Sequence, residues 1–154
     1  MIALRIYRVA HWCWRHKVPA LPWLLKSLNR IVFAVVLPPS ASIGREVILS
    51  YEGLGTVIHR RAVIGDRAII GAGVTVGGRS GSLGVPVIGE GAFIGGGAKV
   101  LGDIRIGAYA SIGANAVVLH DVPDYGVAVG IPARVVRINQ PDDLPNYRSF
   151  QEGA

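Results

Sequence analysis

Residues 62–76 read AVIGDRAIIGAGVTV, and within them an aliphatic residue returns at every sixth position, as Ile64, Ile70 and Val76. The same phase continues in both directions. Its positions are Ile58, Ile64, Ile70, Val76, Ile88, Ile94, Val100, Ile106, Ile112 and Val118, with Ser82 as the single exception. A period of six fits neither an α-helix nor a hairpin meander. It is typical of a hexapeptide β-helix, in which each repeat forms one strand and one turn.

The residues around each aliphatic position fit one side of a three-sided prism. A mostly small residue stands two positions earlier, as at Ala62, Ala68 and Ala92, and we expect both to point inward. Glycine often follows the aliphatic residue and lets the chain turn there. We therefore predict an all-β core at 39–137, a parallel β-helix of about four to five coils. A helical segment at 1–38 precedes it, and a tail at 138–154 follows.

The exception at Ser82 falls in the sequence GRSGSLGVPV at Gly78–Val87, after which the register returns at Ile88. Ten residues of this kind could form a coil side or an excursion of equal length. Their glycines, serines and proline favour a loop that stands off the prism. Loops on rigid scaffolds commonly carry function.

The positions that point outward hold a second pattern, because many are apolar. They include Val57, Val63, Ile69, Val87, Phe93 and Val117. An exposed apolar band of this size is unusual for a soluble monomer. We therefore expect the flat faces to pack against neighbouring chains, and a three-sided prism suits a cyclic homotrimer.

Charge is concentrated at the start of the 154-residue chain. Residues 1–40 hold six basic and no acidic side chains, whereas the other 114 residues hold ten of each. This segment, with Trp12, Trp14 and Trp23, is expected to form two helices broken near Pro19–Pro22. They could cap the first coil and join the trimer interface, or lie on an anionic membrane. Nucleic-acid binding is not expected, since no recognised module accompanies the charge.

The cysteine content and the first residues of the chain indicate its cellular location. A single Cys13 excludes a disulfide framework and suggests a reducing environment. No signal peptide is evident, because basic residues run through the opening segment. We expect a cytoplasmic protein, with the inner face of the membrane as the alternative location.

Four motifs together resemble the hexapeptide-repeat acyltransferases, specifically their serine acetyltransferase-like branch. They are LPPSASIG at 37–44, VTVGGRSG at 74–81, VPVIGEGAFIGGGAKVLGDIRIG at 85–107, and SIGANAVVLHDVP at 111–123 followed by VGIPARVV at 129–136. The resemblance implies left-handed coils, a homotrimer and transfer of an acetyl group from acetyl-CoA to a hydroxyl. The leading hypothesis is therefore an acetyl-CoA-dependent O-acetyltransferase acting on serine, another small molecule, or a sugar or glycan precursor.

The resemblance also locates the family's catalytic side chains. The general-base histidine of serine acetyltransferases matches Tyr51, or Glu52 with a shifted gap. The aspartate that orients it matches Val36, and a second histidine matches Val85. Because all three family side chains are absent, the scaffold is better supported than serine as the substrate. A scaffold or regulatory subunit that binds CoA without turnover is the alternative.

The repeat pattern, considered without the family resemblance, indicates His59 as the candidate base. It stands where the repeat normally places glycine, and Gly77, Gly95 and Gly113 follow at eighteen-residue intervals. If one coil takes eighteen residues, the imidazole heads a column without side chains in which a pantetheine arm could lie. A histidine of ordinary pKa is largely neutral near neutral pH and can accept a proton. A surface histidine bonded to water is the other interpretation, and Glu52 or Tyr51 would then be the base.

Further residues are candidates for binding CoA or the acceptor. The backbone N–H groups of Gly77 and Gly78 could bind the thioester carbonyl, and Ala98 and Ala114 match family positions that line the CoA groove. Arg134 could bind the CoA phosphates through its guanidinium fork. Arg79, at the base of the loop, is a candidate for the acceptor. Each arginine could instead be a solvated rim charge. No metal is expected, since a zinc site needs several histidines on the coils.

Overall fold

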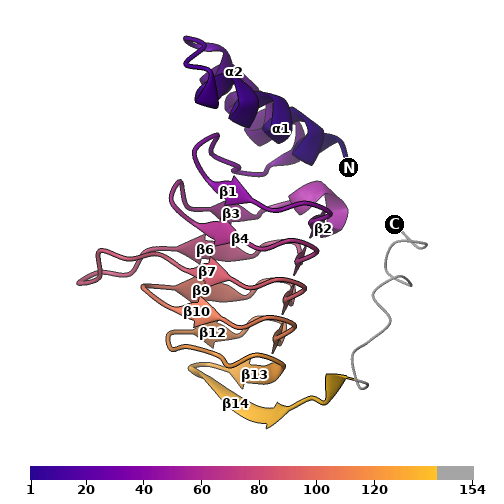
Figure 1. Ribbon diagram of the computed structural model, residues 1–154, viewed down its shortest axis with the longest axis vertical. Helices are drawn as coiled ribbons and strands as arrows, with labels where there is room; N and C mark the ends of the chain where they lie inside the picture. Colours follow the sequence, from indigo (N-terminus) through magenta and orange to yellow (C-terminus); the bar gives the residue numbers. More distant parts are fainter. Residues whose placement is uncertain (142–154) are drawn as a thin grey trace.

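The computed structural model describes residues 1–141 and shows a parallel β-helix below a pair of helices (Figure 1). The helices are α1 (Ile2–Arg15) and α2 (Leu21–Phe33). The strands are β1 (Ser42–Ile43), β2 (Ile48–Leu49), β3 (Val57–Ile58), β4 (Val63–Ile64), β5 (Ile69–Ile70), β6 (Thr75–Gly77), β7 (Val87–Ile88), β8 (Phe93–Ile94), β9 (Lys99–Leu101), β10 (Arg105–Ile106), β11 (Ser111–Ile112), β12 (Val117–Val118), β13 (Gly126–Gly130) and β14 (Ala133–Ile138). A 3₁₀ segment at Ser50–Gly53 interrupts the first coil. The predicted β-helix and N-terminal helices are confirmed.

Three sheets form the sides of the prism. The first has the order β1-β4-β7-β10, the second β3-β6-β9-β12, and the third β2-β5-β8-β11-β13-β14. All pairs within them are parallel except β13 with β14, which is an antiparallel hairpin that closes the C-terminal end. The chain visits the first, third and second sheets in turn, so each coil has three corners.

The interior holds the residues that the period of six predicted. Every aliphatic repeat position from Ile58 to Val118, apart from Ser82, is buried, and so are the small residues at Ala62, Ala68 and Ala92. The corners are tight because successive coils are in backbone contact. A Cβ on Gly71, for example, would lie 2.5 Å from the backbone nitrogen of Gly96. Glycine is therefore required there to keep the coils stacked at the spacing of a parallel sheet.

The chain between β6 and β7 leaves the prism and forms a projecting loop (Figure 1). As a consequence Val76 pairs with Val100, twenty-four residues later, rather than with the residue eighteen positions on. The coils before and after keep the shorter spacing, as in Ile58 with Val76 and Val100 with Val118. The loop thus takes up six residues and moves every later repeat by one side of the prism.

Helix α1 is fixed to the first coil by four hydrogen bonds from three side chains to backbone carbonyls, and by a cap at its start. The Tyr7 hydroxyl donates to the carbonyl of Ala41 at 2.6 Å, and burial raises the pKa of this phenol. His11 Nδ1 donates to the carbonyl of Pro39 at 2.7 Å, and the Arg8 guanidinium donates to those of Ile43 and Gly44. Within residues 1–141, neither helix is long and apolar enough to cross a membrane.

Candidate functional site

His59 lies directly after β3, at the corner where the second sheet leads to the first. We call this the histidine corner, and it comprises residues 59–61, 77–87, 101–103 and 119–121. His59 Nδ1 accepts a hydrogen bond from the backbone N–H of Arg61 at 3.2 Å, which places the proton of the neutral ring on Nε2. Partial burial lowers the pKa of the imidazole, and the charges of Arg61 and Arg60 lower it further. The ring is therefore neutral near neutral pH, as expected.

The projecting loop starts next to His59 at the same corner. Gly77 ends β6 and pairs with Leu101, and the space beside Gly78 is open. The loop is tied to the preceding coil because the Arg61 guanidinium donates to the carbonyl of Leu83. Arg79 packs beside Gly102 at the loop's base and is exposed. The structure thus brings together His59, Gly77, Gly78 and Arg79.

The prediction that Gly95 and Gly113 lie in one column below His59 and Gly77 is wrong. Gly95 and Gly113 follow β8 and β11 of the third sheet, so they lie at a different corner from His59. The prediction assumed eighteen residues for every coil, whereas the coil that contains the loop takes twenty-four. Below Gly77, the histidine corner instead continues through Leu101 and Leu119.

The glycines gather at the corner where the third sheet leads to the second. This glycine corner consists of residues 71–73, 95–97 and 113–115, which read GAG, GGG and GAN. Gly73, Gly97 and Asn115 have positive φ and stack with one another, and each donates its N–H to the preceding coil. The outermost residues of the three turns are Ala72, Gly96 and Ala114. Almost no side-chain atoms therefore stand on this edge of the prism.

Backbone donors are available along the same edge. Among residues 1–141, the N–H groups of Ala72, Gly96 and Ala114 donate to no protein acceptor. At the corner between the first and third sheets, by contrast, Asp66 and Asp124 accept hydrogen bonds from the N–H groups of Arg45 and Ala108. Sequence reasoning missed Ala72 and Gly96. The glycine triplets were the available signal, but the register error hid their alignment.

Tyr51 and Glu52 lie at the upper end of the glycine corner, in the 3₁₀ segment between β2 and β3. Tyr51 is 84% exposed and has positive φ. The Glu52 carboxylate accepts hydrogen bonds from the N–H groups of Ile2 and Ala3, at 2.9 and 2.8 Å. It therefore caps the start of α1, where its charge also complements the helix dipole. This contact gives Glu52 a structural role that the sequence did not predict.

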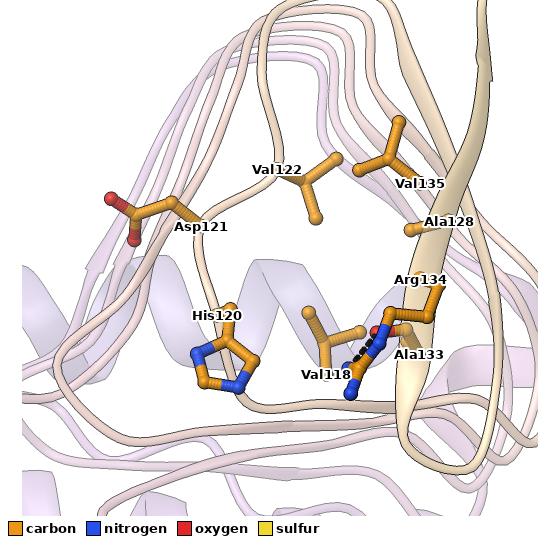
Figure 2. A pocket seen from close by; sticks show the side chains of 8 residues that line it. All are labelled: Val118, His120, Asp121, Val122, Ala128, Ala133, Arg134 and Val135. Atoms are coloured by element: carbon orange, nitrogen blue, oxygen red, sulfur yellow. Dashed lines mark hydrogen bonds between the residues drawn. The ribbon is translucent and has the colours of Figure 1, made fainter.

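The backbone of Arg134 lies at the lower end of the same corner, and its side chain turns toward the open end of the prism. It belongs to β14 and pairs with Val129, which lies against Gly113. Figure 2 shows its guanidinium facing His120 across a cavity of about 360 Å³, while Asp121 points away. Asp121 accepts a hydrogen bond from the N–H of Arg105 instead. The cavity wall is otherwise apolar, so cationic and imidazole groups stand at its mouth.

Two further residues border the glycine corner. Lys99 projects from β9 and donates from Nζ to the carbonyl of Gly73 at 2.7 Å, which places a cation beside the edge. Ala98 is completely buried, with 0% of its surface exposed, so its side chain cannot line an external groove as expected. Its N–H and carbonyl are both used within the coils. Within the described part of the chain, no group of three or more metal-binding side chains occurs.

The sequence is similar to those of known acetyltransferases. The profile of the bacterial transferase hexapeptide (six repeats) matches residues 86–120. The serine acetyltransferase of Escherichia coli strain K12 is 42% identical over 147 residues, which are 94% of this chain and 53% of that protein. These matches confirm the predicted resemblance, although the chain spans about half the length of the curated relatives it matches most fully.

Solved structures agree over the helices and the coils alike. A serine acetyltransferase in complex with cysteine superposes with a TM-score of 0.87 at 37% identity, covering 96% of this chain and 57% of that one. A serine acetyltransferase from Brucella abortus strain S19, in complex with coenzyme A, has a TM-score of 0.85 at 34% identity. The superposition covers 90% of this chain and 56% of the Brucella chain.

Proposed function

We propose that this chain, whose coils carry the hexapeptide repeat of bacterial transferases and whose relatives are serine acetyltransferases, is an O-acetyltransferase that uses acetyl-CoA. The observation that carries the proposal is the glycine corner, a bare edge that runs from Tyr51 to Arg134 along the stack of coils. A solved relative binds coenzyme A on the same fold. Such an edge suits a long, thin ligand that needs close approach to backbone.

Acetyl-CoA suits this edge by its thin, extended shape and by its chemistry. Strands β3, β6, β9 and β12 stack beside it, and three intervals of a parallel sheet span roughly 14 Å. The N–H groups of Ala72, Gly96 and Ala114 can donate to the carbonyls of the pantetheine arm. Arg134 at the lower end, and Lys99 on the flank, supply positive charge for the phosphates. The thioester then lies toward the upper end, near Tyr51.

A homotrimer would bring His59 to that thioester. The histidine corner and the glycine corner are the two edges of the same sheet, β3-β6-β9-β12. If this sheet lines the three-fold axis, each subunit presents its histidine corner to the glycine corner of the next. Cyclic assemblies use such heterologous contacts, in which two different surfaces meet. The exposed Val57 and the partly exposed Val117 on this sheet favour the contact.

The reaction needs one proton to be moved. The acceptor oxygen attacks the thioester carbonyl, the C–S bond breaks, and the hydroxyl proton passes through a base to the leaving CoA thiolate. We propose His59 of the neighbouring subunit as that base. Since its neutral ring carries the proton on Nε2, it must release the Arg61 amide and present an unprotonated nitrogen. Without that change, Nε2–H would instead donate to the oxyanion.

The acceptor is a small molecule with a hydroxyl group, and serine is the first candidate because the relatives are serine acetyltransferases. Arg79 lies on the loop beside His59, where a guanidinium can pair with the carboxylate of an amino acid. A sugar or glycan precursor is the second candidate. We place the protein in the cytoplasm, where acetyl-CoA is available.

A CoA-binding scaffold without turnover is the competing function. By the resemblance, the family's three catalytic side chains match Tyr51 or Glu52, Val36 and Val85, and their replacement favours the alternative. Under it, CoA binds along the glycine corner but no acetyl group is transferred.

Two measurements decide between these functions. Isothermal titration with CoA tests the glycine corner, and failure to bind would exclude both functions. Thiol release from acetyl-CoA is then followed with serine, sugars and other hydroxyl compounds as acceptors. Turnover with any acceptor supports the transferase. Binding without turnover across the panel supports the scaffold.

A further inference from the structure

Helix α2 exposes an apolar face that no described part of the chain covers. Its buried residues are Pro22 and Asn29, and the opposite side forms what we call the α2 stripe. The stripe consists of Leu21, Leu24, Leu28, Ile31 and Val32, all of which are exposed. Leu24 and Ile31 are exposed by 65% and 81%. Residues at these spacings share one side of a helix, so the apolar atoms form a continuous surface.

The charge around this stripe has one sign. Residues 1–40 contain six basic side chains and no acidic one. Arg8 is held by the first coil, whereas Arg5, Arg15, Lys17, Lys26 and Arg30 form no ion pair with any residue in 1–141. The three tryptophans, Trp12, Trp14 and Trp23, are exposed in the same segment, and Lys26 Nζ lies 5.5 Å from the Trp23 ring centre. Tryptophan and basic residues beside an apolar helix face are typical of interfacial helices.

The attachment of the hairpin leaves this surface free. Tyr7, Arg8 and His11 bind α1 to the first coil, and Asn29 of α2 donates to the carbonyl of Ala3 at 3.0 Å. The hairpin therefore crosses the N-terminal end of the prism (Figure 1), with α2 packed on α1. The stripe lies on the side of α2 away from that packing. A flat partner could meet it without disturbing the coils.

We propose that the α1–α2 hairpin docks on the surface of an anionic lipid bilayer, with the α2 stripe in the headgroup and acyl boundary. Charge complementarity selects this partner. A second copy of the hairpin would bring like charges together, which disfavours the contact, whereas anionic headgroups pair with the free basic side chains. Each basic residue near such a surface raises the binding constant about fivefold. The inference does not depend on acetyl transfer.

Vesicle flotation with the full chain tests the proposal. The probes are vesicles of phosphatidylcholine alone and of phosphatidylcholine with an equal part of phosphatidylglycerol. We expect binding to the anionic vesicles only, and weaker binding as salt is raised. The combined Leu24→Ser and Ile31→Ser variant should bind at least about tenfold more weakly, since it removes apolar area from the interface. Val136→Ser, which alters an apolar side chain that is 60% exposed on β14, should bind as the original chain does.

The charge contribution is tested in the same assay. Lys26→Gln with Arg30→Gln should weaken binding by about twenty-fivefold, and Arg137→Gln, on β14, should not change it. If the double serine variant does not fold, Ile31→Ser alone serves, because its side chain is largely in solvent. Circular dichroism and thermal melting show that each variant keeps the coils.

Three outcomes would overturn the proposal. The first is no flotation with anionic vesicles, or equal flotation of the α2-stripe variant. The second is a fall in oligomer mass for that variant without lipid, measured by light scattering, which would assign the stripe to a second copy. The third is tight binding of an RNA oligonucleotide that the stripe variant retains, together with no preference for vesicles. That result would make the hairpin a nucleic-acid surface.

Discussion

The two corners that bound the β3-β6-β9-β12 sheet are built from the same repeat but have opposite character. The histidine corner carries His59, three arginines and a projecting loop. The glycine corner has almost no side chains and has backbone N–H groups that pair with no acceptor in residues 1–141. The position within a repeat therefore determines whether a residue points inward or outward. The corner at which the repeat lies determines which groups surround it. One corner can supply reactive groups, and the other can hold a ligand close to the backbone.

Individual glycines at these corners also have different causes. Gly95 is needed for the stacking of coils, because a Cβ there would lie 2.6 Å from the backbone nitrogen of Ala114. A Cβ at Gly78 would meet no atom of residues 1–141 within 4 Å, so packing does not require glycine there. Open space beside a glycine points to a ligand or a partner, whereas a crowded glycine points to the fold.

The largest effect is expected at His59, which would establish the chemical role of its corner. Replacing it with alanine should lower kcat by about 10²–10⁴-fold, since a general base contributes that much. The proposed trimer should persist, as judged by light scattering. His16→Ala, at an exposed position directly after the end of α1, is the control and should leave kcat unchanged. A His59→Ala enzyme that turns over normally would contradict the assignment of the base.

His59→Gln separates the two roles of the imidazole. A glutamine amide can donate a hydrogen bond from near the position of Nε2 but cannot accept a proton at neutral pH. If His59 is the base, the glutamine variant should be as inactive as the alanine variant. Activity retained within about tenfold would show that the ring acts as a donor to the oxyanion.

The second prediction tests the glycine corner as a ligand site. A leucine at Gly96 would project from the edge, since a Cβ there meets only the carbonyl of Ala72, at 3.4 Å. The Kd for CoA should rise at least about tenfold, because the side chain occupies the proposed groove. The matched control is Ala108→Leu, at the equivalent turn of the corner between the first and third sheets, and the Kd of this variant for CoA should not change. Equal affinities for both variants would place CoA elsewhere.

The third prediction compares the crowded glycine with the open one. Gly95→Ala should lower the free energy of unfolding by about 1–3 kcal/mol, as is typical when a packed site is overfilled. Gly78→Ala should leave the unfolding free energy within about 0.5 kcal/mol of the original, as at an open surface site. Both are measured by urea denaturation. Similar losses at the two positions would mean that Gly95 and Gly78 do not differ in packing.

The fourth prediction concerns Glu52, which the structure places at the start of α1 rather than in the chemistry. Glu52→Ala removes the acceptor for the N–H groups of Ile2 and Ala3, and should lower the unfolding free energy by about 1 kcal/mol. Thermal melting with and without the substitution measures this loss. The kcat should stay within about twofold, and a collapse of kcat in a folded trimer would return Glu52 to the role of base.

Periodicity predicted the interior and the loop composition suggested an excursion, so the fold could be read from the sequence. The column beneath His59 could not be read correctly, because counting by six does not reveal whether residues 78–87 occupy a side of the prism. Pairing decided that question, and it moved Gly95 and Gly113 to another corner. The cap formed by Glu52 joins residues about fifty positions apart, which a pattern of local repeats cannot predict.

The smallest effect should appear in the pH dependence of the histidine corner. Burial and the charges of Arg61 and Arg60 lower the pKa of His59, so kcat/KM should rise with pH and level off with a midpoint below the ordinary histidine pKa of about 6.5. Arg60→Gln removes one like charge, so the protonated ring becomes less unfavourable and the midpoint should move to higher pH. Arg60 is preferable to Arg61 for this test, because the Arg61 side chain also holds the loop at Leu83. Arg45→Gln, which removes an exposed charge at a different corner, is the control and should not move the midpoint. A midpoint that is the same in Arg60→Gln would show that His59 is not the group whose ionisation limits the rate, and the base would then have to be sought at the head of the glycine corner.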